Sequence, residues 1–195
     1  MPINYFYIMT KKELRSKYKQ LRNLLSNHDI EKLSLEIANQ LVNMAVWQQK
    51  YFHVFLPIVE NKEVDTEYLL HILAGKDKEV VVSKSDFETR QMTHYLLTDA
   101  TKFRKNNYNI PEPVDGLEVP VAKIDVVFVP LLAFDINGNR VGYGKGFYDV
   151  FLSECRLDTL KIGLSFFEPE EAIEAVFEQD VTLDYCITPN RVYEF

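Results

Sequence analysis

The segment RVGYGKGFYD, at residues 140–149, combines residue types that suit the binding of a nucleotide phosphate. Its three glycines alternate, so the backbone can curl closely around an anion with its N–H groups pointing inward. Arg140 can bind phosphate oxygens in a bidentate manner, whereas Lys145 acts as a point charge. Asp149 is placed to hold a hard cation that is bound to the same phosphates. The glycines are Gly142, Gly144 and Gly146, and the whole segment predicts a MgATP site.

The spacing within this segment differs from two better-known nucleotide motifs. The Walker pattern needs G-x-x-x-x-G-K followed by Ser or Thr, and the dinucleotide fingerprint has glycines spaced G-x-G-x-x-G. A glycine-rich turn can also exist for tight geometry alone. Three glycines together with Arg, Lys and Asp within ten residues favour phosphate binding over that structural explanation.

The glycine-rich segment lies between a predicted buried strand at 124–130 (IDVVFVP) and a predicted helix at 146–155. Ligands of open α/β sheets collect at the carboxyl ends of such strands. Further strands are predicted at 51–58, 79–83, 91–97 and 160–166. Further helices are predicted at 11–25, from the Ser26 cap to Met44, at 66–73 and at 170–177. This alternation predicts helices covering a mostly parallel or mixed sheet.

The composition favours one enzyme-sized domain and disfavours several other classes. A chain of 195 residues can bury a core without staples, and its net charge of -7 repels nucleic acid. The two cysteines, Cys155 and Cys186, predict neither a disulfide scaffold nor a metal cluster. No stretch approaches the roughly 20 apolar residues of a membrane span, so we expect a cytoplasmic protein. A monomer is the default expectation, because the sequence does not reveal the oligomeric state. We expect residues 1–10 to form a flexible extension, with Met1 or Met9 as the start.

The stretch VPLLAFDINGNRVGYGKGFYD strongly resembles the signature of the 5-formyltetrahydrofolate cyclo-ligases, also called 5,10-methenyltetrahydrofolate synthetases. KKELR, FLPIVENKEVDT, the N-I-P-x-P loop and IGLSF follow the pattern of the same family in the same order. The resemblance implies a three-layer, Rossmann-like single domain over 1–195. It also implies ATP-dependent conversion of 5-formyltetrahydrofolate to 5,10-methenyltetrahydrofolate, ADP and phosphate, with Mg²⁺ required. The formyl oxygen would attack the γ-phosphoryl group, and N10 of the folate would then displace phosphate.

The resemblance assigns roles to individual positions. The implied ATP-binding residues are Lys11, Arg15, Arg140, Gly142, Gly144, Lys145 and Gly146, and the implied magnesium ligands are Asp149 and Asp184. The implied folate-binding residues are Leu56, Glu63, Tyr108, Tyr143, Phe147 and Tyr148. Arg140, Lys145 and Tyr148 are expected to act in catalysis. Without the family pattern, Lys11 and Arg15 would be read as a solvated helix face and the tyrosines as core aromatics.

Some alternatives stay open at this point. Two extra residues precede Glu63 relative to the shortest family versions, so Glu60 could take its place. The four histidines, His28, His53, His71 and His94, match no catalytic position and are expected at the surface or in packing. Two other functions compete with the ligase: a catalytically inactive nucleotide- or folate-binding module, and an enzyme of related fold that acts on phosphosugars.

Overall fold

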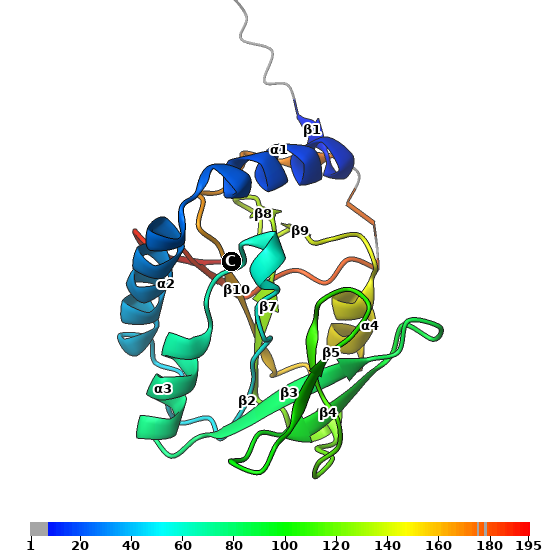
Figure 1. Cartoon of the computed structure of the whole chain (residues 1–195). Helices are drawn as coiled ribbons and strands as arrows, with labels where there is room; N and C mark the ends of the chain where they lie inside the picture. Colours follow the sequence, from blue (N-terminus) through cyan, green and yellow to red (C-terminus); the bar gives the residue numbers. More distant parts are fainter. Residues whose placement is uncertain (1–7, 175, 178) are drawn as a thin grey trace, which may run out of the picture.

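A seven-stranded mixed sheet forms the centre of the molecule in the computed structural model, which describes residues 8–174, 176–177 and 179–195 (Figure 1). The strand order is β13-β12-β10-β7-β2-β3-β4. The five inner strands are parallel, and the two edge strands run antiparallel to their neighbours. The strands are β2 (Tyr51–His53), β3 (Glu79–Ser85), β4 (Met92–Leu96), β7 (Val126–Pro130), β10 (Leu160–Leu164), β12 (Tyr185–Ile187) and β13 (Val192–Glu194). The sequence predicted a mostly parallel or mixed sheet, and the structure confirms a mixed one.

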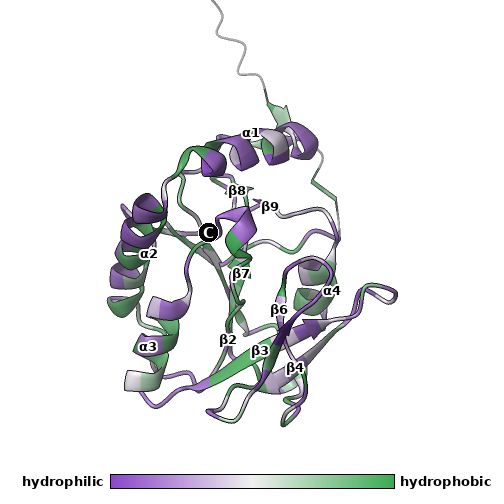
Figure 2. Cartoon of the chain, viewed as in Figure 1, coloured by the Kyte–Doolittle hydropathy of each residue, from purple (hydrophilic) through white to green (hydrophobic). Residues whose placement is uncertain are grey.

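Helices cover both faces of this sheet, because the strands are apolar on both sides. α2 (Asn27–Val42) and α3 (Glu67–Gly75) pack on one face, where Phe52 and Phe128 are fully buried. α4 (Phe147–Glu154) packs on the other face through Phe151 and Leu152. Figure 2 shows the hydrophobic residues gathered along the central strands. The three-layer α/β prediction is therefore confirmed.

α1 (Lys11–Leu24) lies across the carboxyl ends of the strands and begins with a capping box (Figure 1). The Thr10 side chain accepts from the Glu13 backbone N–H, and the Glu13 carboxylate accepts from Thr10. Met9 and Thr10 form β1 (Met9–Thr10) rather than part of a loose extension, while residues 1–7 of the expected extension lie outside the described residues. The capping box predicted at the start of the second helix is present, since Ser26 and Asp29 cap α2 reciprocally.

The helix predicted at 170–177 is wrong. The described residues there contain β11 (Ile173–Glu174), which pairs in parallel with β1. Asp135 explains the extended path, because its buried carboxylate accepts the Ile173 backbone N–H. Glu170 is held from the other side by Lys17 and the Tyr18 hydroxyl of α1. Tertiary contacts thus override the local helix pattern.

The glycine-rich segment is positioned by a short hairpin of β8 (Ala133–Phe134) and β9 (Arg140–Val141). Asp135 in the connecting turn accepts from the backbone N–H groups of Asn137 and Asn139 at 3.0 and 2.9 Å. Its second oxygen accepts from the Asn139 side chain. The turn therefore returns the chain to the carboxyl end of β7 with Arg140 already buried.

The strand predicted at 51–58 ends at His53, and the chain then becomes irregular before a short 3₁₀ turn, η1 (Val59–Asn61). Pro57 lies in the irregular part and lacks a backbone N–H for a ladder. This stretch places Leu56 and Glu63 beside the carboxyl ends of the strands rather than inside the sheet. Opposite it, β5 (Phe103–Lys105) and β6 (Pro111–Pro113) form a hairpin next to β3.

Candidate active site

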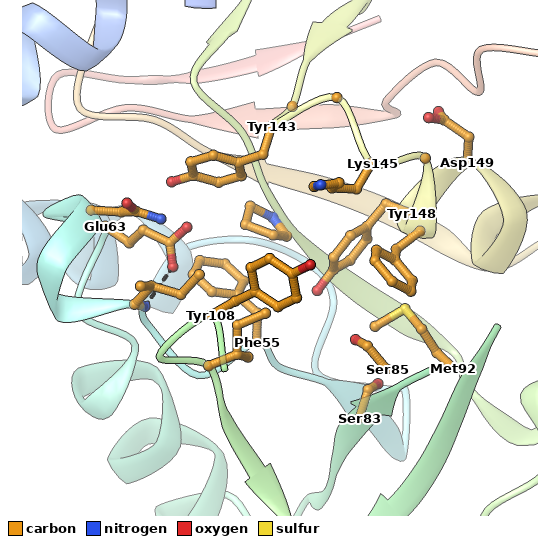
Figure 3. A pocket seen from close by; sticks show the side chains of 18 of the residues that line it. Phe55, Glu63, Ser83, Ser85, Met92, Tyr108, Tyr143, Lys145, Tyr148 and Asp149 are labelled. Carbon is orange, nitrogen blue, oxygen red and sulfur yellow. Dashed lines mark hydrogen bonds between the residues drawn. The ribbon is translucent and has the colours of Figure 1, made fainter. Parts of the chain in front are cut away.

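A cavity of about 440 Å³ opens at the carboxyl ends of β2, β3 and β7, beneath α1 and the glycine-rich segment (Figure 3). Of the residues expected in the site, Asp184 alone is absent from its lining. The residues brought together are Lys11, Arg15, Leu56, Glu63, Tyr108, Arg140, Gly142, Tyr143, Gly144, Lys145, Gly146, Phe147, Tyr148 and Asp149. Sequence positions separated by more than 130 residues thus line one cavity.

The glycine-rich segment is folded tightly against α1. Arg15 donates from Nε to the Gly142 carbonyl at 2.9 Å. Gly144 has φ +87°, and a Cβ at this position would lie 3.2 Å from the Arg15 guanidinium carbon. Gly146 is the N-cap residue of α4 and has φ +80°, a conformation that favours glycine. The glycines therefore provide both the turn and the close approach, and residues 146–149 at the start of α4 line the cavity, at the helix end whose first backbone N–H groups have no partner within the helix.

Arg140 is buried at the base of the segment and pairs with Asp149, with 2.5 Å between Nη2 and Oδ1. It also donates to the Val181 carbonyl. Burial lowers the pKa of Arg140, whereas the charges of Asp149 and Asp180 counteract that shift. A guanidinium this deep stays charged, so it provides fixed positive charge at this end of the cavity.

Further cations face the same end of the cavity. Lys145 is exposed, and its Nζ lies 5.5 Å from the centre of the Tyr108 ring. Lys11 of α1 pairs with Asp180. Burial alone would raise the pKa of Asp180, but Lys11, the Phe177 amide and Arg140 hold it below its usual value. Asp180 is therefore an ionised carboxylate at neutral pH, inside the site.

Asp184, expected to bind a metal beside Asp149, lies elsewhere. Its Oδ2 accepts the Lys161 backbone N–H at 2.7 Å and lies 2.9 Å from Lys161 Nζ. Lys161 is at the amino-terminal end of β10, whereas the cavity is at the carboxyl ends of the parallel strands. Asp180, four residues earlier, lines the cavity instead. In this respect the sequence interpretation needs correction.

Asp149 and Asp180 suit a magnesium ion that is shared with a nucleotide. No group of three or more His, Cys, Asp or Glu side chains could hold a metal within the described part of the chain. Mg²⁺ is usually bound by one or two carboxylates together with substrate phosphates and water. Both carboxylates act on the buried Arg140, which places them around the same cation. The pair therefore fits a metal that enters with its phosphates.

The opposite end of the cavity contains a buried carboxylate, that of Glu63, which is 5% exposed. Its Oε2 accepts the Ile58 backbone N–H at 2.7 Å. Burial raises the pKa of Glu63, while the Ile58 amide, the Tyr143 hydroxyl and the charge of Arg22 counteract the increase. Glu60 is exposed and pairs with Lys105 outside the cavity lining. The geometry thus favours Glu63 over Glu60 as the carboxylate facing a ligand.

Arg22 is a residue of this site that the sequence interpretation missed. It is 3% exposed and donates to the Tyr143 hydroxyl at 2.7 Å and to the Leu131 carbonyl at 2.6 Å. It was assigned no role from the sequence. Arg22 follows Arg15 by seven residues and Tyr18 by four, which puts all three on the same side of α1. This spacing is the sequence signal that could have identified Arg22.

Aromatic side chains form the walls between the two ends. Tyr148 lies beside His53, with ring centres 6.0 Å apart, and burial followed by the charge of Glu63 raises its pKa. Its hydroxyl therefore stays protonated and can donate. Tyr108 stacks on Phe87 at 4.3 Å, and Phe87 meets Phe147 edge-on. Phe87 and Met92 also line the cavity, although no sequence signal marked them.

Of the four histidines, His28 and His71 are exposed and His94 is buried, as expected for surface and packing roles. His53 is also fully buried but lines the cavity. The described helices include none that is both long enough and apolar enough to span a membrane.

Comparison with known proteins identifies the relatives of this chain. Residues 8–189 match the model of the 5-formyltetrahydrofolate cyclo-ligase family. The 5-formyltetrahydrofolate cyclo-ligase of Mus musculus is 29% identical over 153 residues and 74% of each chain. That of Escherichia coli K12 is 30% identical over 139 residues, which are 68% of this chain and 75% of its relative.

Solved structures agree with this match. The 5,10-methenyltetrahydrofolate synthetase of Aquifex aeolicus is 30% identical with a TM-score of 0.76, covering 95% of this chain and 93% of the other. The synthetase of Mycoplasma pneumoniae has a TM-score of 0.73 and covers 93% and 99% of the two chains. At 23% identity, the second likeness concerns the fold alone.

Proposed function

The chain belongs to the 5-formyltetrahydrofolate cyclo-ligase family, and from this premise we propose that it uses ATP to cyclise 5-formyltetrahydrofolate. The products are 5,10-methenyltetrahydrofolate, ADP and phosphate. One observation supports this proposal above all: a single cavity joins a cationic, glycine-rich phosphate site to a buried carboxylate surrounded by aromatic rings. The proposal includes Mg²⁺ dependence, action as a monomer and a cytoplasmic location.

The nucleotide end neutralises phosphate charge. Lys145 and the first-turn N–H groups of α4 face the triphosphate, and Arg140 provides fixed charge below them. Asp149 and Asp180 would hold Mg²⁺, which supplies charge neutralisation at the β- and γ-phosphates when bound. Lys11 and Arg15 bring two more positive charges from α1. Phosphoryl transfer asks a protein mainly for this kind of positioning and charge compensation.

The folate end orients the acceptor. Glu63 accepts hydrogen bonds from the N–H groups of the pterin ring, since a carboxylate offers two acceptor oxygens. Leu56, Tyr143 and Phe147 enclose the rings, and Tyr108 covers them from the loop above. Tyr148, held protonated, donates toward the oxygen that becomes phosphorylated. The aromatic walls exclude water from the reacting atoms.

The reaction then needs no covalent attachment to the protein. The formyl oxygen attacks the γ-phosphorus, and the bond to ADP breaks. N10 next attacks the formyl carbon and gives up its proton, the ring closes, and phosphate leaves with the former formyl oxygen. Both steps occur between the two ends of the cavity, whose lining includes Lys145 and Tyr148.

An absorbance assay tests the proposal directly. Purified protein with 5-formyltetrahydrofolate, Mg²⁺ and ATP should produce the long-wavelength band of methenyltetrahydrofolate, and omission of ATP should abolish it. A folded protein that binds ATP without producing the band would instead support the inactive binding module. Turnover of a phosphosugar without folate turnover would support the other rival.

A further inference from the structure

Three neighbouring strands bring together a serine and two histidines at the wall of the cavity. Ser83 Oγ lies 2.6 Å from His53 Nε2 and 2.9 Å from His94 Nδ1. His53 ends β2, Ser83 lies in β3, and His94 is its cross-strand partner in β4. His53 and His94 are 0% and 3% exposed, whereas Ser83 is half-buried and lines the cavity (Figure 3). The mechanism above uses none of these groups.

A count of hydrogen-bonding sites leaves one site of the Ser83 hydroxyl unused. A serine hydroxyl has one donor and two acceptor sites, and the two imidazoles occupy two of the three. The remaining ring atoms, His53 Nδ1 and His94 Nε2, are buried and have no partner among the described residues. Burial lowers the pKa of His53 well below its ordinary value and that of His94 to about 4. Both rings are therefore neutral near pH 7, and each carries one N–H.

The two buried ring nitrogens that do not contact Ser83, His53 Nδ1 and His94 Nε2, determine the direction of the two hydrogen bonds to Ser83. If an imidazole accepted from Ser83, its own N–H would be the buried atom without a partner. If it donates, the far atom is a bare lone pair, and unpaired buried acceptors are less rare than unpaired buried donors. Both rings therefore donate to Ser83 Oγ, which leaves the serine proton free. Because Ser83 lines the cavity, that proton is available to a ligand.

We propose that Ser83 is a substrate-contacting hydrogen-bond donor, fixed by His53 and His94, which recognises an uncharged acceptor of the folate. The charged phosphate groups are placed elsewhere, since Figure 3 shows Ser83 beside Ser85 and Met92, across the cavity from Lys145 and Asp149. The inference rests on the proposed function. An amide carbonyl of the aminobenzoyl portion is the matching acceptor, because Glu63 and the phosphate end take the pterin and formyl groups.

Kinetics of Ser83→Ala and Ser83→Thr test this contact. The alanine variant should raise the KM for 5-formyltetrahydrofolate roughly tenfold and leave the KM for ATP unchanged, because only the folate loses a hydrogen bond. The threonine variant keeps the hydroxyl and should restore most of the affinity. A parent-like folate KM in an active, folded alanine variant overturns the contact while leaving the proposed function intact. An inactive parent that binds no folate overturns both.

Nitrogen NMR of the histidine rings supplies a test that needs neither turnover nor a variant. We expect His53 as the Nε2–H tautomer and His94 as the Nδ1–H tautomer in the free protein at pH 7. Adding the folate should shift these resonances more than adding MgATP does. Finding His94 as the Nε2–H tautomer would show that it accepts from Ser83 and would overturn the proposed donor.

Discussion

Replacing Glu63 with glutamine separates ligand recognition from stability, because the side chain keeps its shape and loses its charge. In the parent, Oε2 accepts the Ile58 amide, and the carboxylate can accept from the pterin as well. Glutamine keeps one acceptor oxygen, but its NH₂ group is a donor. This group would face either a pterin N–H or the Ile58 N–H, from which it cannot accept a hydrogen bond. One charge-assisted hydrogen bond is lost, which is worth about 1.5 to 3 kcal/mol. We expect the folate KM to rise about 10- to 100-fold.

The absorbance assay measures this effect, with ATP titrated separately as the internal reference. The ATP KM should change less than the folate KM, since Glu63 lies at the other end of the cavity from Asp149 (Figure 3). Glu60→Gln is the matched control, because that carboxylate is exposed and pairs with Lys105. A larger effect on ATP than on folate, or an equal loss in the Glu60 variant, would refute the assignment of Glu63 to the pterin.

The same variant makes an opposite prediction for stability. Burial raises the pKa of Glu63 in the folded state, so ionising it costs folding free energy. The free energy of unfolding of the parent should therefore fall as pH rises from about 4.5, the ordinary pKa, through the raised folded value. Glu63→Gln lacks this decline and should melt at a higher temperature than the parent at pH 7. Thermal unfolding at several pH values tests the sign, and a lower melting temperature would contradict it.

Four further substitutions test the rest of the site. Asp149→Asn should raise the magnesium concentration for half-maximal rate at least tenfold, whereas Asp184→Asn should leave it unchanged; equal effects would restore Asp184 to the metal site. Lys145→Ala should raise the ATP KM about tenfold with an unchanged melting temperature, because this lysine is exposed, and an unchanged ATP KM would exclude a phosphate contact. Arg22→Met should lower the free energy of unfolding by about 3 kcal/mol in urea titrations. The same variant should move the acid limb of folate binding to higher pH, since the charge that lowers the pKa of Glu63 is lost. An unshifted limb would show that Arg22 does not act on Glu63.

The sequence predicted most of the elements because their patterns are local. The caps of α2, the apolar run of β7 and the helical spacing in α1 each depend on neighbours within a few residues. The pattern at 170–177 failed because the Asp135 carboxylate, which lies far away in the chain, holds the Ile173 backbone in an extended form. No local propensity carries that information.

The site was predictable where one segment carries the chemistry. Arg140, Lys145 and Asp149 lie within ten residues, so their types and spacing predicted that they share one site, and all three line the cavity. Asp180 and Asp184 show the limit, since two acids four residues apart look equally suitable in an irregular stretch. Only the start of β12 at Tyr185 fixes Asp184 at the amino-terminal edge of the sheet. The position of a residue along a strand of the sheet depends on tertiary structure. The length of a strand separates the amino-terminal edge, where Asp184 lies, from the carboxyl ends, where the cavity opens.

α1 makes contacts at both ends of the cavity. Lys11 contacts Asp180, and Arg15 contacts the Gly142 carbonyl at the nucleotide end. Arg22, on the same helix, reaches Tyr143 at the folate end, and its charge favours the ionised form of Glu63. A helix advances about 1.5 Å per residue, so Arg15 and Arg22 are spaced roughly 10 Å apart along one rigid element. The charge that favours the ionised form of Glu63 and the contact that shapes the glycine-rich segment therefore have a common support, and any shift of α1 along its axis would misplace both at once.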